Sequence, residues 1–217
     1  MGLVGKKAMG ERENDYRMVE IRQEDVERVL EFLRKFFFKD EPLNLCIGLL
    51  EDGKRCEELE AFCTSSIPDG LSLMAISPTN EIVGVCLNGI LTRDGGDDHP
   101  HCTHPKFSKV VALLDRVSRE SDLFGRFPDV NKALDIKVAS VHADYRGRGI
   151  AKALFDATKK MAKVLGFNLV KVDCSSHFTA LAVAKLGFHS IYSLDYKDHV
   201  DNDGRPIFEP EPPHCKV

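Results

Sequence analysis

Two arginines and two glycines are clustered at residues 146–149, where the sequence reads Arg-Gly-Arg-Gly and continues with Ile150 and Ala151. An apolar run at 136–141 precedes this cluster, and a run with helical spacing at 151–165 follows it. Glycine lets the backbone curl close to a ligand, and the first amides of a helix point outward with partial positive charge. Arginine side chains can also pair with phosphate oxygens. The segment therefore predicts a diphosphate-binding turn between a strand and a helix.

Two common diphosphate-binding motifs do not match this turn. A Rossmann fold has G-x-G-x-x-G after an early strand and an acidic residue about 20 positions later. Here only Gly147 and Gly149 are present, in the second half of the chain, and Asp173 is an isolated match to the acidic position. The G-x-x-x-x-G-K-[ST] sequence of a P-loop is absent. The observed spacing is Arg-x-x-Gly-x-Ala instead.

Hydrophobic spacing predicts helices and strands that are interspersed along the chain. Helical spacing indicates helices at 24–37, 54–65, 106–121, 151–165 and 178–186. Apolar or alternating runs indicate strands at 18–22, 71–77, 81–91, 136–141, 169–174 and 188–196. The second and third strands flank Pro78-Thr79-Asn80 and are expected to form an antiparallel hairpin. This order predicts one mixed α/β domain at 17–217, preceded by a disordered polar leader at 1–16.

Composition is typical of a globular protein and argues against several classes of partner. With 43% hydrophobic and 29% charged residues, the 217 residues suit one domain with a core of ordinary size. A net charge of −4 gives no electrostatic reason to expect nucleic acid. No apolar run approaches the roughly 20 residues that span a bilayer, and the polar N-terminus does not match a signal peptide. The seven cysteines are irregularly spaced, so we expect free thiols and a cytoplasmic location.

The glycine turn and the segments that follow it resemble the GNAT superfamily of acetyltransferases. The diphosphate loop of that family reads Gln/Arg-x-x-Gly-x-Gly/Ala, and a strand, a helix and a Leu-Gly-Phe turn follow it, as at 169–188 here. The resemblance implies acetyl-coenzyme A as co-substrate. It also implies an α/β fold with a mixed, mostly antiparallel sheet flanked by helices. Two parallel strands of that sheet are expected to splay apart.

Three further segments resemble the insect arylalkylamine N-acetyltransferases, namely Phe-Phe-Lys-Asp-Glu-Pro-Leu-Asn at 37–44, His-Pro-Lys-Phe at 104–107 and Cys-Ser-Ser-His-Phe-Thr at 174–179. The resemblance extends from about residue 18 to residue 214. It implies transfer of acetyl to the primary amine of a small arylalkylamine, by direct attack in a ternary complex. His142, Phe178 and Thr179 differ from the residues common in that family, which affects the expected amine preference more than the reaction.

The resemblance also assigns roles to individual residues. Glu41 matches the general base, acting through water, and the hydroxyls of Ser175 and Thr179 match groups that assist catalysis. An alkylammonium has a pKa near 10, so less than about 1% is neutral at pH 7 and a proton acceptor helps. A serine at 175 or 176 could instead cap the helix predicted at 178–186. The residues expected to contact the cofactor are Ala139, Ser140, Val141, Arg146, Gly147, Arg148, Gly149, Ile150, Ala151 and Ser176.

Other chemistries match parts of the sequence less well. The Ser-Ser-His run at 175–177 lacks the G-x-S-x-G elbow of many serine hydrolases, and Cys174 is either an acyl carrier or a core residue. The histidines around Cys102 lack the paired spacing of a zinc site, so no metal is expected. Alternative functions are acetylation of another small amine (a polyamine, histamine or a hydrazine-like amine), acetylation of a protein N-terminus, and non-catalytic binding of acetyl-coenzyme A. The expected partner is a small molecule, without nucleic acid or membrane, and the expected state is a monomer.

Overall fold

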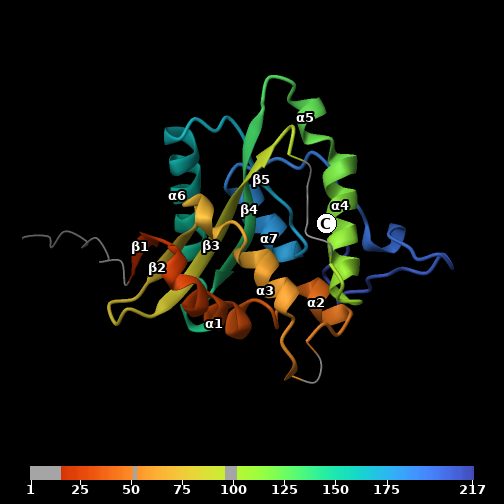
Figure 1. Ribbon diagram of the computed structural model, residues 1–217, viewed down its shortest axis with the longest axis horizontal. Helices are drawn as coiled ribbons and strands as arrows, with labels where there is room; N and C mark the ends of the chain where they lie inside the picture. The colour runs from red at the N-terminus through yellow and green to blue at the C-terminus, as the bar shows by residue number, and fades with distance from the viewer. Residues whose placement is uncertain (1–15, 51–52, 96–101) are drawn as a thin grey trace, which may run out of the picture.

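The computed structural model describes residues 16–50, 53–95 and 102–217, which contain a five-stranded sheet with helices on both faces (Figure 1). The strands lie side by side in chain order. The first three pairings are antiparallel, and the last, between β4 and β5, is parallel. The predicted mixed, mostly antiparallel sheet is confirmed. The strands are β1 (Arg17–Glu20), β2 (Leu73–Ile76), β3 (Ile82–Thr92), β4 (Lys132–Val141) and β5 (Val170–Val172).

Helices cover the sheet in two layers that bury separate apolar clusters. One cluster lies between the sheet and the helices α1 to α4. The other lies between the sheet and the helices α6 and α7. In α1 the spacing of Val29, Leu30 and Leu33 places three buried side chains on one face, as an amphipathic helix requires. The helices are α1 (Val26–Phe36), α2 (Pro42–Cys46), α3 (Glu57–Thr64), α4 (Phe107–Ser121), α5 (Leu123–Arg126), α6 (Ile150–Val164) and α7 (His177–Lys185). Short 3-10 turns occupy Gln23–Asp25, Ile67–Asp69, Ala143–Tyr145 and Tyr196–Asp198.

A glycine in β3 sets how closely α6 approaches the sheet. A Cβ atom at Gly84 would lie 2.9 Å from Cγ2 of Ile150 and 3.3 Å from the carbonyl oxygen of Ser140. Ile150 is the first residue of α6, so the helix begins in direct contact with β3 and beside the end of β4. This contact holds the N-terminus of α6 next to the strand that leads into the glycine turn.

A β-bulge in β4 changes which residues face each layer. Leu87 of β3 pairs with Val138 and Asn88 pairs with Ile136, so Lys137 is the extra residue of the bulge. Because alternate residues of a strand face opposite sides, the extra residue shifts the alternation. Ile136 then packs with the cluster under α6, whereas Val138 packs with the cluster under α1 and α3. Lys137 itself is half-buried.

The parallel pairing between β4 and β5 is short. It joins Leu134–Ile136 to Val170–Val172, and β4 then continues to Val141. Within the described chain, residues 137–141 have no strand partner on the β5 side. The two strands therefore separate towards the glycine turn, which is the expected splay.

The strand predicted at 188–196 is wrong. The described segment 188–194 joins no strand ladder, and a cavity of about 660 Å³ lies between β5 and residues 187–193. Backbone hydrogen bonds of Leu194 go instead to Val217 at the end of the chain, at 2.8 and 3.0 Å. A segment with alternating apolar residues forms a strand only where another strand lies at hydrogen-bonding distance. Here the cavity separates residues 187–193 from β5.

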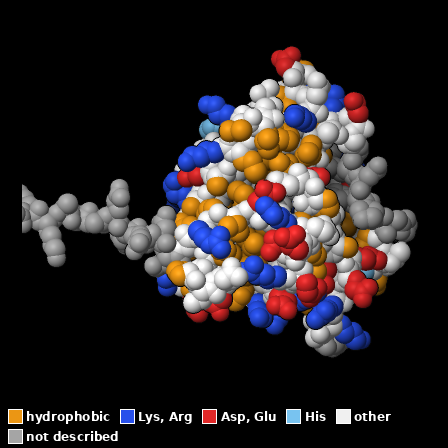
Figure 2. All heavy atoms as spheres, turned by 60° about the vertical axis from the view of Figure 1, so that its left-hand side comes forward, with side chains coloured by type: hydrophobic (Ala, Val, Ile, Leu, Met, Phe, Trp, Pro, Cys, Tyr) orange, Lys and Arg blue, Asp and Glu red, His pale blue; other side chains and the backbone are white. Residues whose placement is uncertain are grey.

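The other predicted helices and strands are present with small changes in their bounds, and the hairpin between β2 and β3 is confirmed. The short helices α2 and α5 are additional to the predicted helices. All seven cysteines are free thiols, and none of the described helices is long and apolar enough to cross a bilayer. Basic and acidic side chains are interspersed over the face shown in Figure 2. The predicted leader falls almost wholly outside the described residues.

Candidate functional site

Glu41 lies at the junction of α1 and α2, with its side chain turned into the protein. It is the N-cap of α2, and its Oε2 accepts a hydrogen bond from the backbone amide of Asn44 at 2.7 Å. Its second oxygen, Oε1, is buried and receives no hydrogen bond of standard geometry from the described residues. An unpaired buried carboxylate oxygen is costly in a protein interior, which makes it a candidate for a ligand contact.

Burial raises the pKa of the Glu41 carboxyl above its usual range. The nearby Ser175 hydroxyl and the backbone amides of Asn44 and Leu43 favour the carboxylate and oppose this change, but burial has the larger effect. A raised pKa brings a carboxyl closer to neutrality, where a general base is most effective. Burial therefore makes the Glu41 carboxylate a stronger proton acceptor than an exposed carboxylate.

Ser175 follows β5, lines the same cavity as Glu41, and its hydroxyl lies beside the Glu41 carboxyl. The hydroxyl of Tyr196, a buried side chain, donates a hydrogen bond to the Ser175 carbonyl oxygen at 2.7 Å and holds this residue in place. Ser176 is the next residue and occupies the N-cap position of α7. Within the described chain its side chain makes no capping bond, and the His177 amide donates instead to Nδ1 of His214 at 3.2 Å. Of the two serines, Ser175 is the one beside Glu41.

Thr179 is not placed with these groups. It lies half-buried in the first turn of α7, and the described residues that line the cavity around Glu41 do not include it. Four-residue spacing puts side chains on one helix face, but Ser175 precedes α7 and does not follow the helical repeat. The structure therefore brings together Glu41 and Ser175 and leaves Thr179 outside their cavity.

The cavity around Glu41, here called the Glu41 cavity, has a volume of about 110 Å³ and lies between the sheet and the helices α2, α3 and α4. Most of its wall is apolar and partly aromatic. Its apolar lining is Phe37, Leu43, Leu59, Phe62, Cys63, Phe107, Val110, Leu114, Ile136 and Val138. Its polar lining beyond Glu41 and Ser175 is Asn44, Ser118, Asp135, Lys137, Lys171 and Asp173. A largely apolar molecule that carries a polar or charged group suits such a mixed lining.

Most polar residues of this wall were missed in the sequence. Lys171, Asp173 and Ser175 alternate with Val170, Val172 and Cys174, so one face of β5 and its extension is polar. Lys171 lies 2.8 Å from Asp173 and 3.9 Å from Asp135 on β4. The alternation was visible in the sequence, but it is equally typical of a strand with one face in solvent.

The glycine turn has the geometry of an anion site. Gly147 and Gly149 have φ angles of +76° and +81°, in the left-handed region that favours glycine. Gly149 is the N-cap of α6, so the amides of Ile150 and Ala151 belong to its first turn. A Cβ atom at either glycine would meet no described atom within 4 Å, which leaves open space above the turn.

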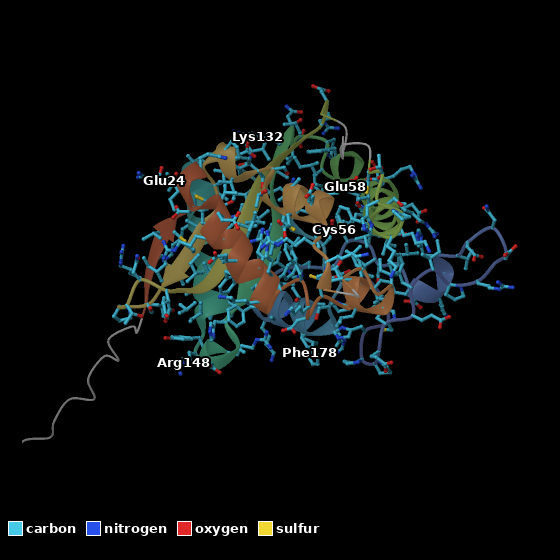
Figure 3. All side chains as sticks on the ribbon, turned by 60° about the horizontal axis from the view of Figure 1, so that its bottom comes forward. Glu24, Cys56, Glu58, Lys132, Arg148 and Phe178 are labelled. Carbon is cyan, nitrogen blue, oxygen red and sulfur yellow. The ribbon has the colours of Figure 1, made fainter. Side chains whose placement is uncertain are left out.

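Both arginines lie at the surface of this turn. Arg148 packs over the ring of Tyr145, 4.7 Å from its centroid, and Arg146 pairs with Asp40 at 2.7 Å, next to Glu41. Arg148 and Phe178 lie at the same end of the molecule, whereas Lys132 lies at the opposite end (Figure 3). The turn and the start of α7 thus flank the end where β4 and β5 splay.

The three expected residues of β4 lie along the splayed segment. The residues Ala139, Ser140 and Val141 pair with β3 on one side and face the splay on the other. The hydroxyl of Ser140 donates to the Phe36 carbonyl oxygen at 3.0 Å, which ties β4 to the end of α1. Ser140 therefore has a structural bond in addition to any contact made by its backbone.

One alternative chemistry, an acyl-enzyme on Cys174, is weakened by the structure. Burial, with a smaller effect of Asp173, raises the pKa of Cys174 to about 11, so its thiol is protonated at neutral pH and is a poor acyl carrier. No metal-binding group of three or more His, Cys, Asp or Glu residues occurs among the described residues. Cys102 instead donates to Oε2 of Glu58 at 2.7 Å, and His99 and His101 lie outside the described residues.

Comparison with known proteins assigns the fold to a family. The model of the acetyltransferase (GNAT) family matches residues 16–188. Arylalkylamine N-acetyltransferase 2 from Aedes aegypti is 34% identical, over 94% of this chain and 96% of that chain, with a TM-score of 0.88. The apo form of an agmatine N-acetyltransferase mutant is 25% identical, over 94% and 97% of the two chains, with a TM-score of 0.84. A Drosophila melanogaster polyamine N-acetyltransferase that forms N-acetylagmatine is also 25% identical over 94% and 97%, with a TM-score of 0.81. The chain therefore belongs to the GNAT family of acetyltransferases, which use acetyl-coenzyme A as co-substrate.

Proposed function

We propose that the protein transfers acetyl from acetyl-coenzyme A to the primary amine of a small arylalkylamine. The observation that carries this proposal is the Glu41 cavity, because its aromatic and aliphatic lining also includes the buried Glu41 carboxyl oxygen and the hydroxyl residue Ser175. An aromatic ring matches the apolar wall, and a cationic amine matches the carboxylate. The 34% identity to an arylalkylamine N-acetyltransferase supports the same substrate class.

In the proposed reaction the diphosphate of the co-substrate binds the turn at 146–151 and the start of α6. Its pantetheine arm lies where β4 and β5 splay, and backbone amides of residues 139–141 stabilise the negative charge on the thioester oxygen. Glu41, acting through water, accepts a proton from the ammonium group, and the neutral amine attacks the acetyl carbon. The tetrahedral intermediate then expels the thiolate of coenzyme A, and the extra proton on the nitrogen passes to this thiolate, which gives the neutral amide and free coenzyme A. The Ser175 hydroxyl donates a hydrogen bond to this thiolate as it leaves.

A substrate panel tests the proposal directly. Release of free thiol from acetyl-coenzyme A is measured with tyramine, dopamine, serotonin, histamine, putrescine and agmatine. We expect kcat/KM to be highest for the arylalkylamines, by at least about tenfold, because burial of a ring adds about 1.5–3 kcal/mol of binding free energy. Binding of coenzyme A in calorimetry without thiol release from any amine would identify a non-catalytic module instead.

Ser175 is expected to contribute to turnover more than Thr179 does. The Ser175→Ala variant should lower kcat about tenfold, because the departing thiolate loses a hydrogen-bond donor. Thr179→Ala should lower kcat less, since Thr179 lies outside the Glu41 cavity. The matched control is Ser108→Ala, which removes an exposed hydroxyl at the start of α4. Equal losses in the Ser175 and Thr179 variants would contradict this assignment.

Agmatine and polyamines are a second candidate class. Two relatives that are 25% identical to this chain act on agmatine or polyamines by their names, and the Glu41 cavity contains the additional carboxylates of Asp135 and Asp173. These groups could pair with a second cationic group on the acceptor. The same panel separates the two classes, since agmatine and putrescine carry that second charge.

The seven free thiols support a reducing compartment, and we infer that the enzyme works in the cytoplasm.

A further inference from the structure

Lys137 places a positive charge in the wall of the cavity that is proposed to receive a cationic substrate. It is the extra residue of the β4 bulge, and its side chain reaches towards α3. Its ammonium nitrogen lies 5.8 Å from the centroid of the Phe62 ring, which also lines the Glu41 cavity. Lysine at such a position is unexpected for an amine-binding site, because like charges repel more strongly in a partly buried cavity than in water.

The backbone leaves room for this side chain. Gly89 of β3 lies beside it, and a Cβ atom there would be 3.0 Å from Cε of Lys137 and 3.6 Å from its ammonium nitrogen. The absence of a side chain at this position therefore allows the lysine stem to cross β3. The bulge and the glycine together direct the ammonium to the α3 side of the cavity, close to Phe62.

The two lysines of the Glu41 cavity differ in how they are neutralised. Lys171 lies within 4.0 Å of both Asp135 and Asp173, so carboxylates compensate its charge. Lys137 has no carboxylate within that distance among residues 16–50, 53–95 and 102–217. The ammonium group of Lys137 lies instead near the aromatic ring of Phe62, which attracts a cation without cancelling its charge.

A formal charge count shows what the cavity can accept. Glu41, Asp135 and Asp173 contribute three negative charges, and Lys137 and Lys171 contribute two positive charges, which leaves one net negative charge. One ammonium group balances this charge. A diamine or agmatine brings two positive charges and leaves the cavity with a net positive charge, near an ammonium that lacks a carboxylate partner. Burial makes such an imbalance unfavourable.

We propose that Lys137 is a specificity-determining residue that excludes amines with a second cationic group from the Glu41 cavity. This inference rests on the proposed function, since it concerns the same cavity, and it assigns to one side chain the choice between monoamines and agmatine-like dications. Lys137 acts by repulsion of the distal cation, and the carboxylate at Glu41 remains the partner of the reacting amine. Specificity built from repulsion of the wrong ligand is common in binding sites.

The test compares Lys137→Met, Lys137→Gln and Lys137→Arg with the unaltered protein. The ratio of kcat/KM for agmatine to kcat/KM for tyramine is measured by thiol release. We expect this ratio to rise at least about tenfold in the Met and Gln variants, because both remove the charge. The Arg variant keeps the charge and should retain the original ratio. Lys132→Met is the matched control, since Lys132 is an exposed residue at the start of the same strand.

A binding measurement separates failure of this inference from failure of the proposed function. Calorimetry with coenzyme A present gives dissociation constants for agmatine and tyramine without turnover. An agmatine-to-tyramine ratio that is unchanged in Lys137→Met and Lys137→Gln overturns the role of Lys137, whether or not acetyl is transferred. A protein that releases no thiol with any amine, but whose dissociation constants shift as expected, overturns the proposed reaction and retains the selectivity of Lys137. Equal shifts in Lys137→Met and Lys132→Met also overturn the inference, because they would reflect overall charge.

Discussion

The Glu41→Gln variant is expected to lower kcat about a hundredfold near pH 7, because loss of a general base typically lowers rates by about 10²–10⁴-fold. Glutamine keeps the shape of the side chain and can still accept the hydrogen bond from the Asn44 amide. It cannot accept a proton from the substrate ammonium. The measurement is thiol release under saturating acetyl-coenzyme A. Turnover that remains unchanged would remove Glu41 from the mechanism.

The pH dependence of the same variant gives an independent check. Glu41 must be deprotonated to act, and burial raises its pKa above the usual range. The kcat of the unaltered protein should therefore fall as pH decreases through this raised pKa, at higher pH than for an exposed carboxyl. The Glu41→Gln variant should lack this acidic limb. Its activity should recover partly at high pH, where more of the amine is neutral.

Stability distinguishes a catalytic loss from an unfolded variant. A carboxyl whose pKa is raised on folding contributes stability below its unfolded pKa and loses that contribution as pH rises through the folded pKa. At pH values above this raised pKa the ionised Glu41 therefore disfavours the fold, and there the neutral Gln variant should have an equal or higher Tm. The difference should shrink on acidification. The matched control is Glu31→Gln, an exposed position on α1 that should change neither Tm nor kcat.

The Gly149→Ala variant is expected to raise KM for acetyl-coenzyme A at least about tenfold, equal to ~1.4 kcal/mol of binding free energy. Gly149 has a φ angle of +81°, and a side chain there costs about 1–2 kcal/mol of strain. The added methyl group also enters the open space above the turn, where the diphosphate is proposed to lie. Both effects weaken the contact between the cofactor and the first amides of α6.

Gly166 provides a matched control for this substitution. It follows the C-terminal end of the same helix with a φ angle of +74°, and a Cβ atom there would also meet no described atom within 4 Å. Gly166→Ala should thus impose similar strain and lower Tm by a similar amount, while leaving KM for acetyl-coenzyme A unchanged. If both variants raise KM equally, the effect comes from a loosened α6 and not from the turn.

Local features of the sequence predicted much of the fold. The helices α1, α4 and α6 follow from apolar spacing over several turns, and the hairpin of β2 and β3 follows from its turn residues. Apolar spacing and turn residues depend on amino acids within one segment, so the helices and the hairpin that they predict are present in the tertiary structure. The strand predicted at 188–196 is absent because its formation depends on residues outside the segment. A strand depends on a partner far away in the sequence, and the described partner of Leu194 is Val217.

The candidate site also has a part that the sequence predicted and a part that only the tertiary structure revealed. Sequence alone predicted the glycine turn at 146–151 and the helix that follows it, because glycine spacing and a helix start are properties of consecutive residues. Resemblance added Glu41 and Ser175, which the structure places at one cavity, and Thr179, which it does not. Only the tertiary structure decided that the Glu41 carboxyl is buried and that Lys137 lines the same cavity. Burial and charge balance are sums over residues from α2, α3, α4, β4 and β5, and no single segment of the chain carries that information.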